Sequence, residues 1–240
     1  MISIFETNKN FINILTMKKY IILTITFLVS FTGISQDKKH KEVNALLEKI
    51  VSEKKVMGVV AAYSVDGKTV AIAAAGYANK KAKKQFTTET QLRMGSIAKP
   101  MTALAVMQLV EQGSLDLDAP IQTYIPDYPK HSKTQITTRH LLSHTSGIGG
   151  YKDGRESNTT KDYPTLYDAL SLFKDRTLLF EPGTQYSYTT YGYTVLGVII
   201  ERVSGLTFEE YMQKNIWDKA GMTKTGVDKF GVKMENKSES

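Results

Sequence analysis

Ser96 and Lys99 have the residue types and the spacing of an activated nucleophile. The segment that follows, Met101 to Val110, is apolar in the pattern of a helix. Residues three apart share a helix face, so the Lys99 amine could reach Ser96 Oγ and take its proton. A lysine, whose ordinary pKa is about 10.4, acts as a base only where desolvation, another cation or a positive helix end favours the neutral amine. The pair therefore predicts a serine nucleophile with Lys99 as general base.

The Ser-x-x-Lys spacing is not specific on its own. It occurs four times in this chain, at Ser35/Lys38, Ser52/Lys55, Ser96/Lys99 and Ser171/Lys174. Only Ser96 opens a strongly apolar helical pattern. Serine is also a common helix N-cap, so the tetrapeptide alone favours that structural role.

Three further segments make the pattern specific: LLSHTSGI at residues 141–148, EPGT at 181–184 and YTTYGY at 188–193. With the Ser96 helix and Gly221-Met222, they give the chain from about Gly58 to about Val227 a sequence that resembles the serine β-lactamase and D-alanyl-D-alanine peptidase family, in its class C-like branch. The resemblance implies that Ser96 forms an acyl-enzyme, that Lys99 assists, and that Tyr188 shares the proton transfer. It implies no cofactor.

Tyr188 is chemically suited to that role, because a phenol beside a lysine ammonium is drawn toward phenolate and can act as a base. Four tyrosines crowd this segment, however, and closely spaced aromatics often pack instead. They are Tyr186, Tyr188, Tyr191 and Tyr193. The register relative to residues 181–183 selects Tyr188.

Thr190 stands where the family pattern usually carries asparagine. Threonine offers a single hydroxyl close to the backbone, whereas asparagine offers two donors and an acceptor at longer reach. Two interpretations stay open. Thr190 is a weak substitute in substrate binding, or a β-branched residue at a helix start with no substrate contact.

The family's last motif is a strand, commonly Lys-Thr-Gly or His-x-Gly, that supplies an oxyanion-hole amide. Residues Lys224-Thr225-Gly226 spell this motif but follow a helical pattern, and we interpret them as a helix-exit turn. Residues 228–240 are predicted to be a polar tail. Because the final strand is then missing, the 240-residue chain is predicted to be truncated and a poor or inactive catalyst.

The predicted fold is α+β, of the β-lactamase/transpeptidase type, with a helical subdomain and an incomplete antiparallel sheet. Residues 36–90 should hold a helix from Lys41 to Lys54 and a lone two-stranded hairpin, Gly58 to Ser64 and Lys68 to Gly76, around Asp66-Gly67. Residues 91–227 should hold the nucleophile helix and the helical subdomain. Its further helices are expected at Thr138 to His144, Tyr163 to Lys174, Tyr191 to Val203 and Thr207 to Lys219.

Residues 1–35 have the pattern of a signal peptide, with Met17 as an alternative start. A basic Met17-Lys18-Lys19 precedes the apolar run Tyr20 to Phe31, which is too short to span a membrane, and cleavage is expected after Ser35. The chain contains no cysteine, so no lipoprotein anchor is expected. The predicted location is periplasmic or secreted, without a stable membrane anchor after cleavage.

Nucleic acid and metal are not predicted partners. The net charge of +7 becomes +5 without the three lysines and one glutamate of residues 1–35, and the remaining basic clusters lack interleaved aromatics. His140 and His144 have a metal-binding spacing, but Leu141 stands where a metalloprotease needs glutamate. We interpret His144 as a buried hydrogen-bonding residue at a helix exit.

The sequence thus predicts an exported serine acyl hydrolase that acts on a D-amino-acid peptide, a β-lactam or a small ester through acyl-Ser96. The alternative is a non-catalytic derivative that binds cell-wall peptide or a protein partner. The choice of substrate and the oligomeric state stay open at this stage.

Overall fold

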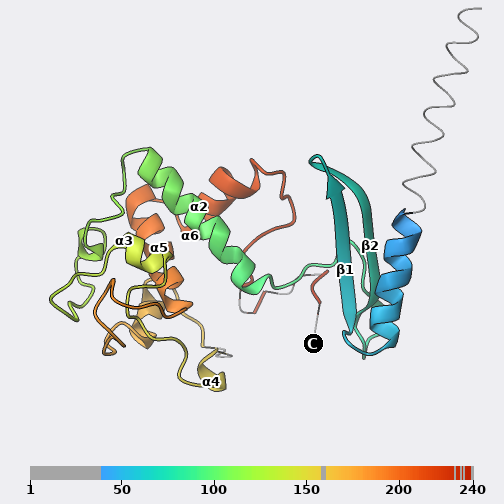
Figure 1. Cartoon of the computed structure of the whole chain (residues 1–240), viewed down its shortest axis with the longest axis horizontal. Coiled ribbons are helices and arrows are strands. Elements are labelled where there is room, and N and C mark those ends of the chain that lie inside the picture. Colours follow the sequence, from blue (N-terminus) through green and yellow to red (C-terminus); the bar gives the residue numbers. More distant parts are fainter. Residues whose placement is uncertain (1–38, 158–160, 230, 233, 235, 239–240) are drawn as a thin grey trace, which may run out of the picture. The chain divides into compact units, whose positions relative to one another are not determined.

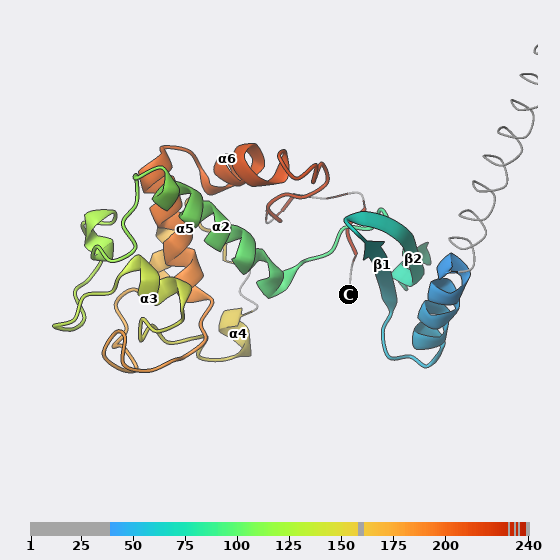
Figure 2. The same ribbon diagram turned by 45° about the horizontal axis from the view of Figure 1, so that its top comes forward.

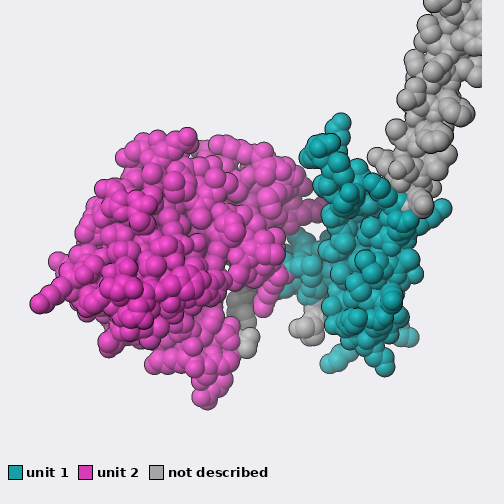
Figure 3. All heavy atoms as spheres, in the orientation of Figure 1, with its two compact units in different colours: residues 1–92, 234–240 teal, residues 93–233 magenta. Residues whose placement is uncertain are grey.

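The computed structural model describes residues 39–157, 161–229, 231–232, 234 and 236–238. They belong to two compact units (Figure 3): unit 1 comprises residues 1–92 and 234–240, and unit 2 comprises residues 93–233. The predicted signal peptide at 1–35 lies outside the described residues. Within the described part, no helix combines the length and the apolar character needed to cross a membrane.

Unit 1 is a helix at residues 39–52 against a small antiparallel sheet of β1 (Gly58–Val65), β2 (Lys68–Asn79) and β3 (Lys84–Gln85), in that order (Figure 1). The predicted hairpin is confirmed: Gly58 pairs with Gly76 and Val65 with Lys68. Its two turn residues, Asp66 and Gly67, both have positive φ, 49° and 73°. That is the backbone of a two-residue turn whose twist matches the strands.

The expectation of a lone two-stranded hairpin is wrong, because β3 adds a third strand to β2. The lysine-rich loop after β2 turns the chain back, helped by Asn79 Oδ1, which accepts from Ala82 N at 2.9 Å. The polar tail also pairs with unit 1, since Gln91 N donates to Asn236 O at 2.8 Å and Ser238 N donates to Gln91 O at 3.0 Å. Backbone pairing does not depend on side-chain polarity, so composition could not reveal it.

The core of unit 1 is thin. Its helix–sheet cluster buries Leu47, Ala73 and Ala75, with half-buried Val43, Ile50, Val51, Val59 and Ala61 against them. Unit 1 also buries Ala71, Ala78 and Phe86. Alternate alanines on one face of β2 let the helix approach the sheet closely. On the helix Leu47 is buried against the sheet, whereas its neighbour Leu46 is 57% exposed.

Unit 2 is helical, with α2 and α5 packed together at its centre (Figures 1 and 2). In chain order its elements are η1 (Gly95–Ile97), α2 (Ala98–Glu111), η2 (Ile121–Thr123), α3 (Thr138–Leu142), α4 (Gly154–Ser157), η3 (Asp168–Leu172), α5 (Tyr191–Ser204), α6 (Phe208–Met212) and the π-helical turn η4 (Gln213–Trp217). The core takes Ala105, Val106 and Leu109 from α2 and a buried run from α5 that includes Leu196, Ile199 and Ile200.

The end of α5 and the start of α6 each lie within one residue of the predicted bounds. Gly205 caps α5 with φ 72°, a left-handed conformation that glycine adopts without strain. Thr207 then opens α6 with a capping box, in which its side chain accepts from Glu210 N while the Glu210 carboxylate accepts from Thr207 N. These local signals were sufficient because each acts within one turn of the chain.

The predicted helix over Tyr163 to Lys174 is wrong, since only the 3-10 segment η3 forms there. Asp168 draws the chain into a local turn, because its carboxylate accepts from Thr165 N at 3.0 Å and from Thr165 Oγ1 at 2.7 Å. Phe173 leaves the helical path to stack on Tyr191, with ring centroids 4.2 Å apart. Tertiary packing therefore overrides the apolar periodicity.

Two other helices also end earlier than predicted. The helix expected over Thr207 to Lys219 changes after Met212 into η4, where Asn215 Nδ2 donates to Tyr211 O at 3.0 Å and Gln108 Nε2 donates to Asn215 O at 3.2 Å. Side chains thus take backbone carbonyls that a regular helix would use. Helix α3 ends at Leu142, two residues before the expected end.

Candidate active site

Ser96 lies in the 3-10 turn that leads into α2. The preceding Gly95 has φ 55°, which lets the chain turn sharply into the helix. The N-cap of α2 is Ile97, without a side-chain capping bond. Ser96 is therefore not a helix cap, and its exposed hydroxyl is available for other contacts.

The structure brings Ser96, Lys99 and Tyr188 together. Lys99 Nζ donates to Ser96 Oγ at 3.0 Å, and the Tyr188 hydroxyl donates to the same oxygen at 2.6 Å. Lys99 Nζ also lies 4.9 Å from the centroid of the Tyr188 ring. One serine oxygen is thus held between two groups that can exchange a proton, although Tyr188 is 92 residues away in sequence.

The other described Ser-x-x-Lys pairs make different contacts. Ser52 Oγ donates to Lys49 O at 2.8 Å, and Ser171 Oγ donates to Asp168 O at 2.6 Å. Their lysines turn elsewhere: Lys55 to a carboxylate and Lys174 to a tyrosine ring. Ser35/Lys38 lies outside the described residues. Of the three described pairs, Ser96/Lys99 is the one whose lysine donates to its serine.

Electrostatics favour ionisation of Tyr188. The hydrogen bond with Lys99, followed by that with Ser96, lowers the pKa of the Tyr188 phenol below its ordinary value of 10.0. The neighbouring Tyr193 behaves in the opposite way, because burial raises its pKa. Of these two phenols, Tyr188 is thus the better base.

The four tyrosines of this segment have four different environments. Tyr186 is 67% exposed, Tyr191 is buried against Phe173, and the Tyr193 hydroxyl donates to Leu142 O at 3.2 Å. Tyr188 alone among them bonds Ser96. Packing accounts for Tyr191 and Tyr193 but not for Tyr188.

Thr190 lies at the start of α5 and close to Lys99. It is the N-cap residue of α5, but its side chain makes no capping bond. Its hydroxyl lies 3.5 Å from Lys99 Nζ, at the outer limit of a hydrogen bond. The residue therefore starts the helix and also lies beside the Ser96–Lys99–Tyr188 cluster.

Sequence reasoning missed two members of the cluster, His144 and Tyr193. The His144 ring lies 4.5 Å from the Tyr188 ring and 5.3 Å from the Tyr193 ring, between centroids. The Tyr193 ring also lies 5.6 Å from Lys99 Nζ. The signal for Tyr193 was its position three residues after Thr190, on the same helix face. His144 is half-buried and hydrogen-bonded, as expected at a helix exit.

The two histidines of the i, i+4 pair have separate structural roles. His140 Nδ1 accepts from Thr137 N at 3.3 Å in the capping box of α3. His144 Nδ1 accepts from Thr189 N at 3.3 Å. In the described part of the chain, no group of three or more His, Cys, Asp or Glu residues could hold a metal ion.

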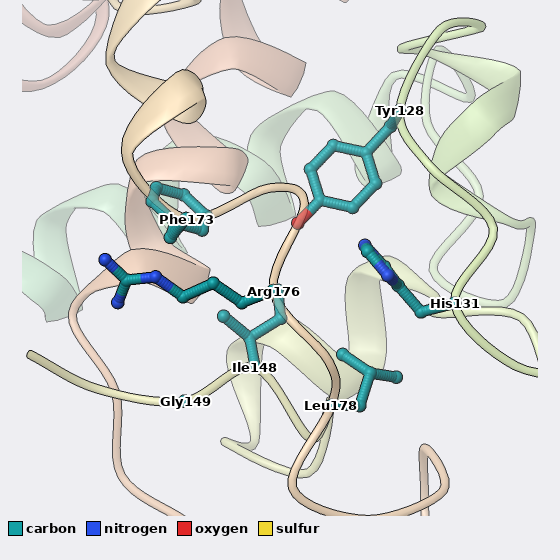
Figure 4. Close-up of a pocket in the computed structure, with 7 residues that line it drawn as sticks. All are labelled: Tyr128, His131, Ile148, Gly149, Phe173, Arg176 and Leu178. Carbon is teal, nitrogen blue, oxygen red and sulfur yellow. The ribbon is translucent and has the colours of Figure 1, made fainter. Parts of the chain in front are cut away.

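A small cavity lies beneath the loop that carries Gly149 (Figure 4). Tyr128, His131 and Phe173 surround it, together with Arg176 and the aliphatic side chains of Ile148 and Leu178. Its volume of about 10 Å³ is close to that of one water molecule. It is therefore too small to receive a substrate.

Lys224-Thr225-Gly226 lies in irregular chain, in agreement with its interpretation as a turn. Among the described residues of unit 2, the only β pairing is the isolated bridge between Pro120 and Thr137. The described side chains at Ser96 therefore come from η1, α2 and the segment that leads into α5.

The comparison with known families agrees with this geometry. Residues 43–236 match the family model described as Beta-lactamase. The chain belongs to the Beta-lactamase family. The match spans both units, and the predicted α+β fold of the β-lactamase/transpeptidase type is confirmed by solved structures.

Among those structures is the octameric penicillin-binding protein homologue from Pyrococcus abyssi, with a TM-score of 0.72 and 30% identity over 82% of this chain and 47% of that one. Human serine beta-lactamase-like protein LACTB, mitochondrial, is 32% identical over 72% of this chain and 44% of its own length. Esterase EstB of Burkholderia gladioli is 31% identical over 68% of this chain and 45% of its own length. The chain thus spans less than half the length of these relatives.

Proposed function

We propose that this chain carries the acylation machinery of an exported serine acyl hydrolase, with Ser96 as nucleophile and Lys99 and Tyr188 as the coupled base. The observation that carries the proposal is the pair of hydrogen bonds to Ser96 Oγ, 3.0 Å from Lys99 and 2.6 Å from Tyr188. Membership of the Beta-lactamase family, whose members include penicillin-binding proteins and esterases, supports it.

The proposed reaction has two halves. Ser96 Oγ attacks the acyl carbon and passes its proton to the Lys99–Tyr188 pair, so that the new C–O bond forms as the hydroxyl is deprotonated. The tetrahedral intermediate then expels the amine or alcohol, which takes the proton back from the pair. Water attacks acyl-Ser96 in the same way, releases the acid and restores the hydroxyl.

The substrates we propose are a D-amino-acid peptide, a β-lactam or a small ester. All three contain an electrophilic carbonyl that a serine can acylate. Relatives with esterase and D-amino acid amidase in their names support the range but do not choose within it. Thr190, 3.5 Å from Lys99, is the proposed contact for the polar part of the substrate. The export is proposed from residues 1–35 alone.

Covalent labelling tests the nucleophile. A fluorescent penicillin and a fluorophosphonate should each label the chain once, at Ser96, as located by peptide mass spectrometry. Ser96→Ala should abolish the label without changing the circular dichroism spectrum. Ser171→Ala is the matched control, because Ser171 also precedes a lysine by three residues but bonds only its own turn. It should label at the wild-type rate.

The outcomes separate the two functional hypotheses. A label that survives Ser96→Ala would place the nucleophile elsewhere. A folded wild-type chain that resists both probes but binds a D-alanyl-D-alanine peptide in calorimetry would favour the non-catalytic alternative. Among substrates, turnover of a D-alanyl-D-alanine peptide, a chromogenic cephalosporin and a nitrophenyl ester, measured side by side, would select the substrate class.

A further inference from the structure

His144 contacts Tyr188 in a way that neither the sequence motif nor the proposed mechanism explains. Its backbone φ is 58°, the left-handed conformation that many helices adopt at the residue after the C-cap, which is Ser143 in α3. At this φ the imidazole ring lies 4.5 Å from the Tyr188 ring, between centroids.

His144 also holds both chain neighbours of Tyr188. Its carbonyl oxygen accepts from Ser187 N at 2.9 Å, and its Nδ1 accepts from Thr189 N at 3.3 Å. The backbone on either side of Tyr188 is thus tied to one residue, and the same residue packs on the Tyr188 ring. A hydroxyl positioned this way has little freedom to leave Ser96 Oγ.

The surrounding loops strengthen this attachment. The segment after α3 and the segment before α5 are joined by three further hydrogen bonds: Gly183 N to Thr145 O at 2.8 Å, Leu179 N to Gly147 O at 2.8 Å and Thr189 Oγ1 to Gly149 O at 3.0 Å. Gly147 has φ 76°, and a Cβ there would lie 2.3 Å from Phe180 O. The two segments therefore pack backbone against backbone, with His144 at the end nearest Ser96.

We propose that His144 is a positioning residue, which holds the Tyr188 hydroxyl on Ser96 and does so only while its imidazole is neutral. The inference rests on the proposed function, because it assumes that Tyr188 takes part in acylation. His144 itself is not assigned a contact with substrate. Its effect on the reaction passes through Tyr188.

The requirement for a neutral ring follows from the contacts of Nδ1. An imidazolium carries a proton on both nitrogens, so Nδ1 could no longer accept from Thr189 N. The groups that face the His144 ring are Lys99 from α2, Tyr186 and Tyr188 from the segment that leads into α5, and Tyr193 from α5. None of them is a carboxylate that would stabilise an imidazolium, and the charged form of Lys99 repels one.

These surroundings keep His144 neutral at pH 7. Burial, followed by repulsion from Lys99, lowers the pKa of His144 below its ordinary value of 6.5. Below that lowered pKa the ring becomes charged and the bond to Thr189 is lost. Acylation should then depend on two protonation events on the acid side, one from the Lys99–Tyr188 pair and one from His144.

Two variants separate the contribution of the His144 ring from that of its Nδ1 acceptor. His144→Asn keeps an acceptor near the Nδ1 position and tolerates a left-handed φ, but it removes the ring. His144→Phe keeps a ring against Tyr188 but removes the acceptor. His131→Asn is the matched control, because the His131 ring packs edge-on against Tyr128 and lines the small cavity.

The measurement is the fluorophosphonate labelling of Ser96 as a function of pH, separated into the maximal rate and the half-saturating probe concentration. His144→Phe should lower the maximal rate roughly ten- to a hundredfold and leave the half-saturating concentration unchanged, because a base is displaced while the probe site stays intact. His144→Asn should recover part of the rate. In both His144 variants the labelling rate should fall with decreasing pH through one protonation step instead of two, whereas His131→Asn should keep both steps.

A second readout does not depend on activity. In protein labelled with ¹³C-tyrosine, the Tyr188 resonance, assigned by its loss in Tyr188→Phe, should shift as His144 titrates. This step should be absent from both His144 variants. Wild-type labelling rates and pH profiles in both His144 variants, with Ser96→Ala unlabelled, would overturn the inference and leave the proposed function standing. A wild-type chain that never labels would overturn the proposed function, and the resonance would then decide whether His144 holds Tyr188.

Discussion

The two units of the chain differ most in what their cores contain. Unit 2 buries 22 hydrophobic side chains in one cluster around α2 and α5, whereas the helix–sheet cluster of unit 1 has three, two of which are alanines. Because hydrophobic stabilisation grows with the apolar area removed from water, the packing of unit 2 is the stronger support for a precise site. All of the described site residues, Ser96, Lys99, Tyr188 and Thr190, lie in unit 2.

The difference shows how the catalytic geometry is maintained. Ser96 and Lys99 are attached to α2, which buries Ala105, Val106 and Leu109 in the larger core. Tyr188 comes from the segment that enters α5, and α2 packs directly on α5. The distance between the nucleophile and its proposed base is thus fixed by the packing of these two helices. A base and nucleophile must lie within hydrogen-bond reach, which loops alone hold poorly.

The largest expected effect tests whether Lys99 and Tyr188 of unit 2 act on Ser96 as one coupled base. Lys99→Ala and Tyr188→Phe should each slow the acylation of Ser96 by a factor on the order of a thousand, because each removes one partner of the nucleophile. The double variant should be little slower than either single one, since residues that act as a unit are not additive. Stopped-flow labelling with the fluorescent penicillin measures all three rates.

The pH profile sharpens the same prediction. The hydrogen bond from Lys99 lowers the pKa of Tyr188, so the phenolate becomes available below pH 10.0. At pH values where His144 is neutral, labelling should rise with pH through one apparent value that belongs to the pair and reach a plateau. In Lys99→Ala the residual rate should rise only at higher pH. Near-normal labelling by Tyr188→Phe at every pH would show that another group is the base.

The composition of the site could largely be predicted from the sequence, but its arrangement could not. Ser96, Lys99 and Tyr188 were identified from their spacing and segment order, and the structure brings them within hydrogen-bond distance. Their proposed catalytic roles stay predictions. His144 was expected only as a structural residue, because its contacts with Tyr188 and Thr189 join segments 44 and 45 residues apart. No local pattern contains that pairing.

The fold was predictable where the signal is local. The turn at Asp66-Gly67 and the stop at Gly205 depend on the backbone freedom of one or two residues, and both were confirmed. The helix expected over residues 163–174 failed where Phe173 leaves the helical path to stack on Tyr191. The third strand, β3, was missed because two residues are too few to show a β pattern. A contact made at a distance therefore explains the first failure, whereas β3 pairs with residues nearby in the chain, Tyr77 and Asn79.

Matched core substitutions test the comparison of the two units. Ile199→Ala in α5 removes a fully buried side chain from the centre of the larger core, and it should cost about 2 to 5 kcal/mol of unfolding free energy. Leu47→Ala removes a side chain that half-buried neighbours surround, so the site can collapse and the cost should fall toward the low end of that range. Hydrogen exchange locates each loss, in the amides of α5 for the first and of β1 and β2 for the second.

Exposed substitutions in the same two elements serve as controls. Arg202→Ala in α5 and Leu46→Ala in the helix of unit 1 remove side chains outside the two buried clusters. Leu46→Ala should change the unfolding free energy by less than about 0.5 kcal/mol. Arg202→Ala should cost less than about 1 kcal/mol, because the Arg202 guanidinium lies 5.3 Å from the centroid of the Tyr167 ring. If Leu47→Ala lost as much unfolding free energy as Ile199→Ala, the helix–sheet packing of unit 1 would be as sensitive to a cavity as the larger core. The proposed difference between the two units would then be wrong.

One ion pair in each unit extends the comparison to charged groups. In unit 2, Arg176 bonds the carboxylate of Glu156, whose side chain is 9% exposed, and this bond together with one from Lys152 N lowers the pKa of Glu156 to about 2. In unit 1, Lys55 Nζ lies 2.5 Å from Glu53, with side chains 66% and 36% exposed. Glu156→Gln should cost about 1 to 3 kcal/mol at pH 7, and Glu53→Gln less than about 1 kcal/mol.

The two ion pairs should also differ in how their contribution to stability depends on pH. Because the folded state lowers the pKa of Glu156 from 4.5 to about 2, its stabilisation is complete above pH 4.5 and is lost as the pH falls toward 2. Urea unfolding at several pH values should therefore show the gap between wild type and Glu156→Gln closing across that window. The small gap for Glu53→Gln should instead shrink with added salt, which screens exposed charges. A Glu156→Gln gap that stayed constant from pH 7 to pH 2 would mean that the carboxylate stabilises unit 2 by its shape and packing rather than by its charge.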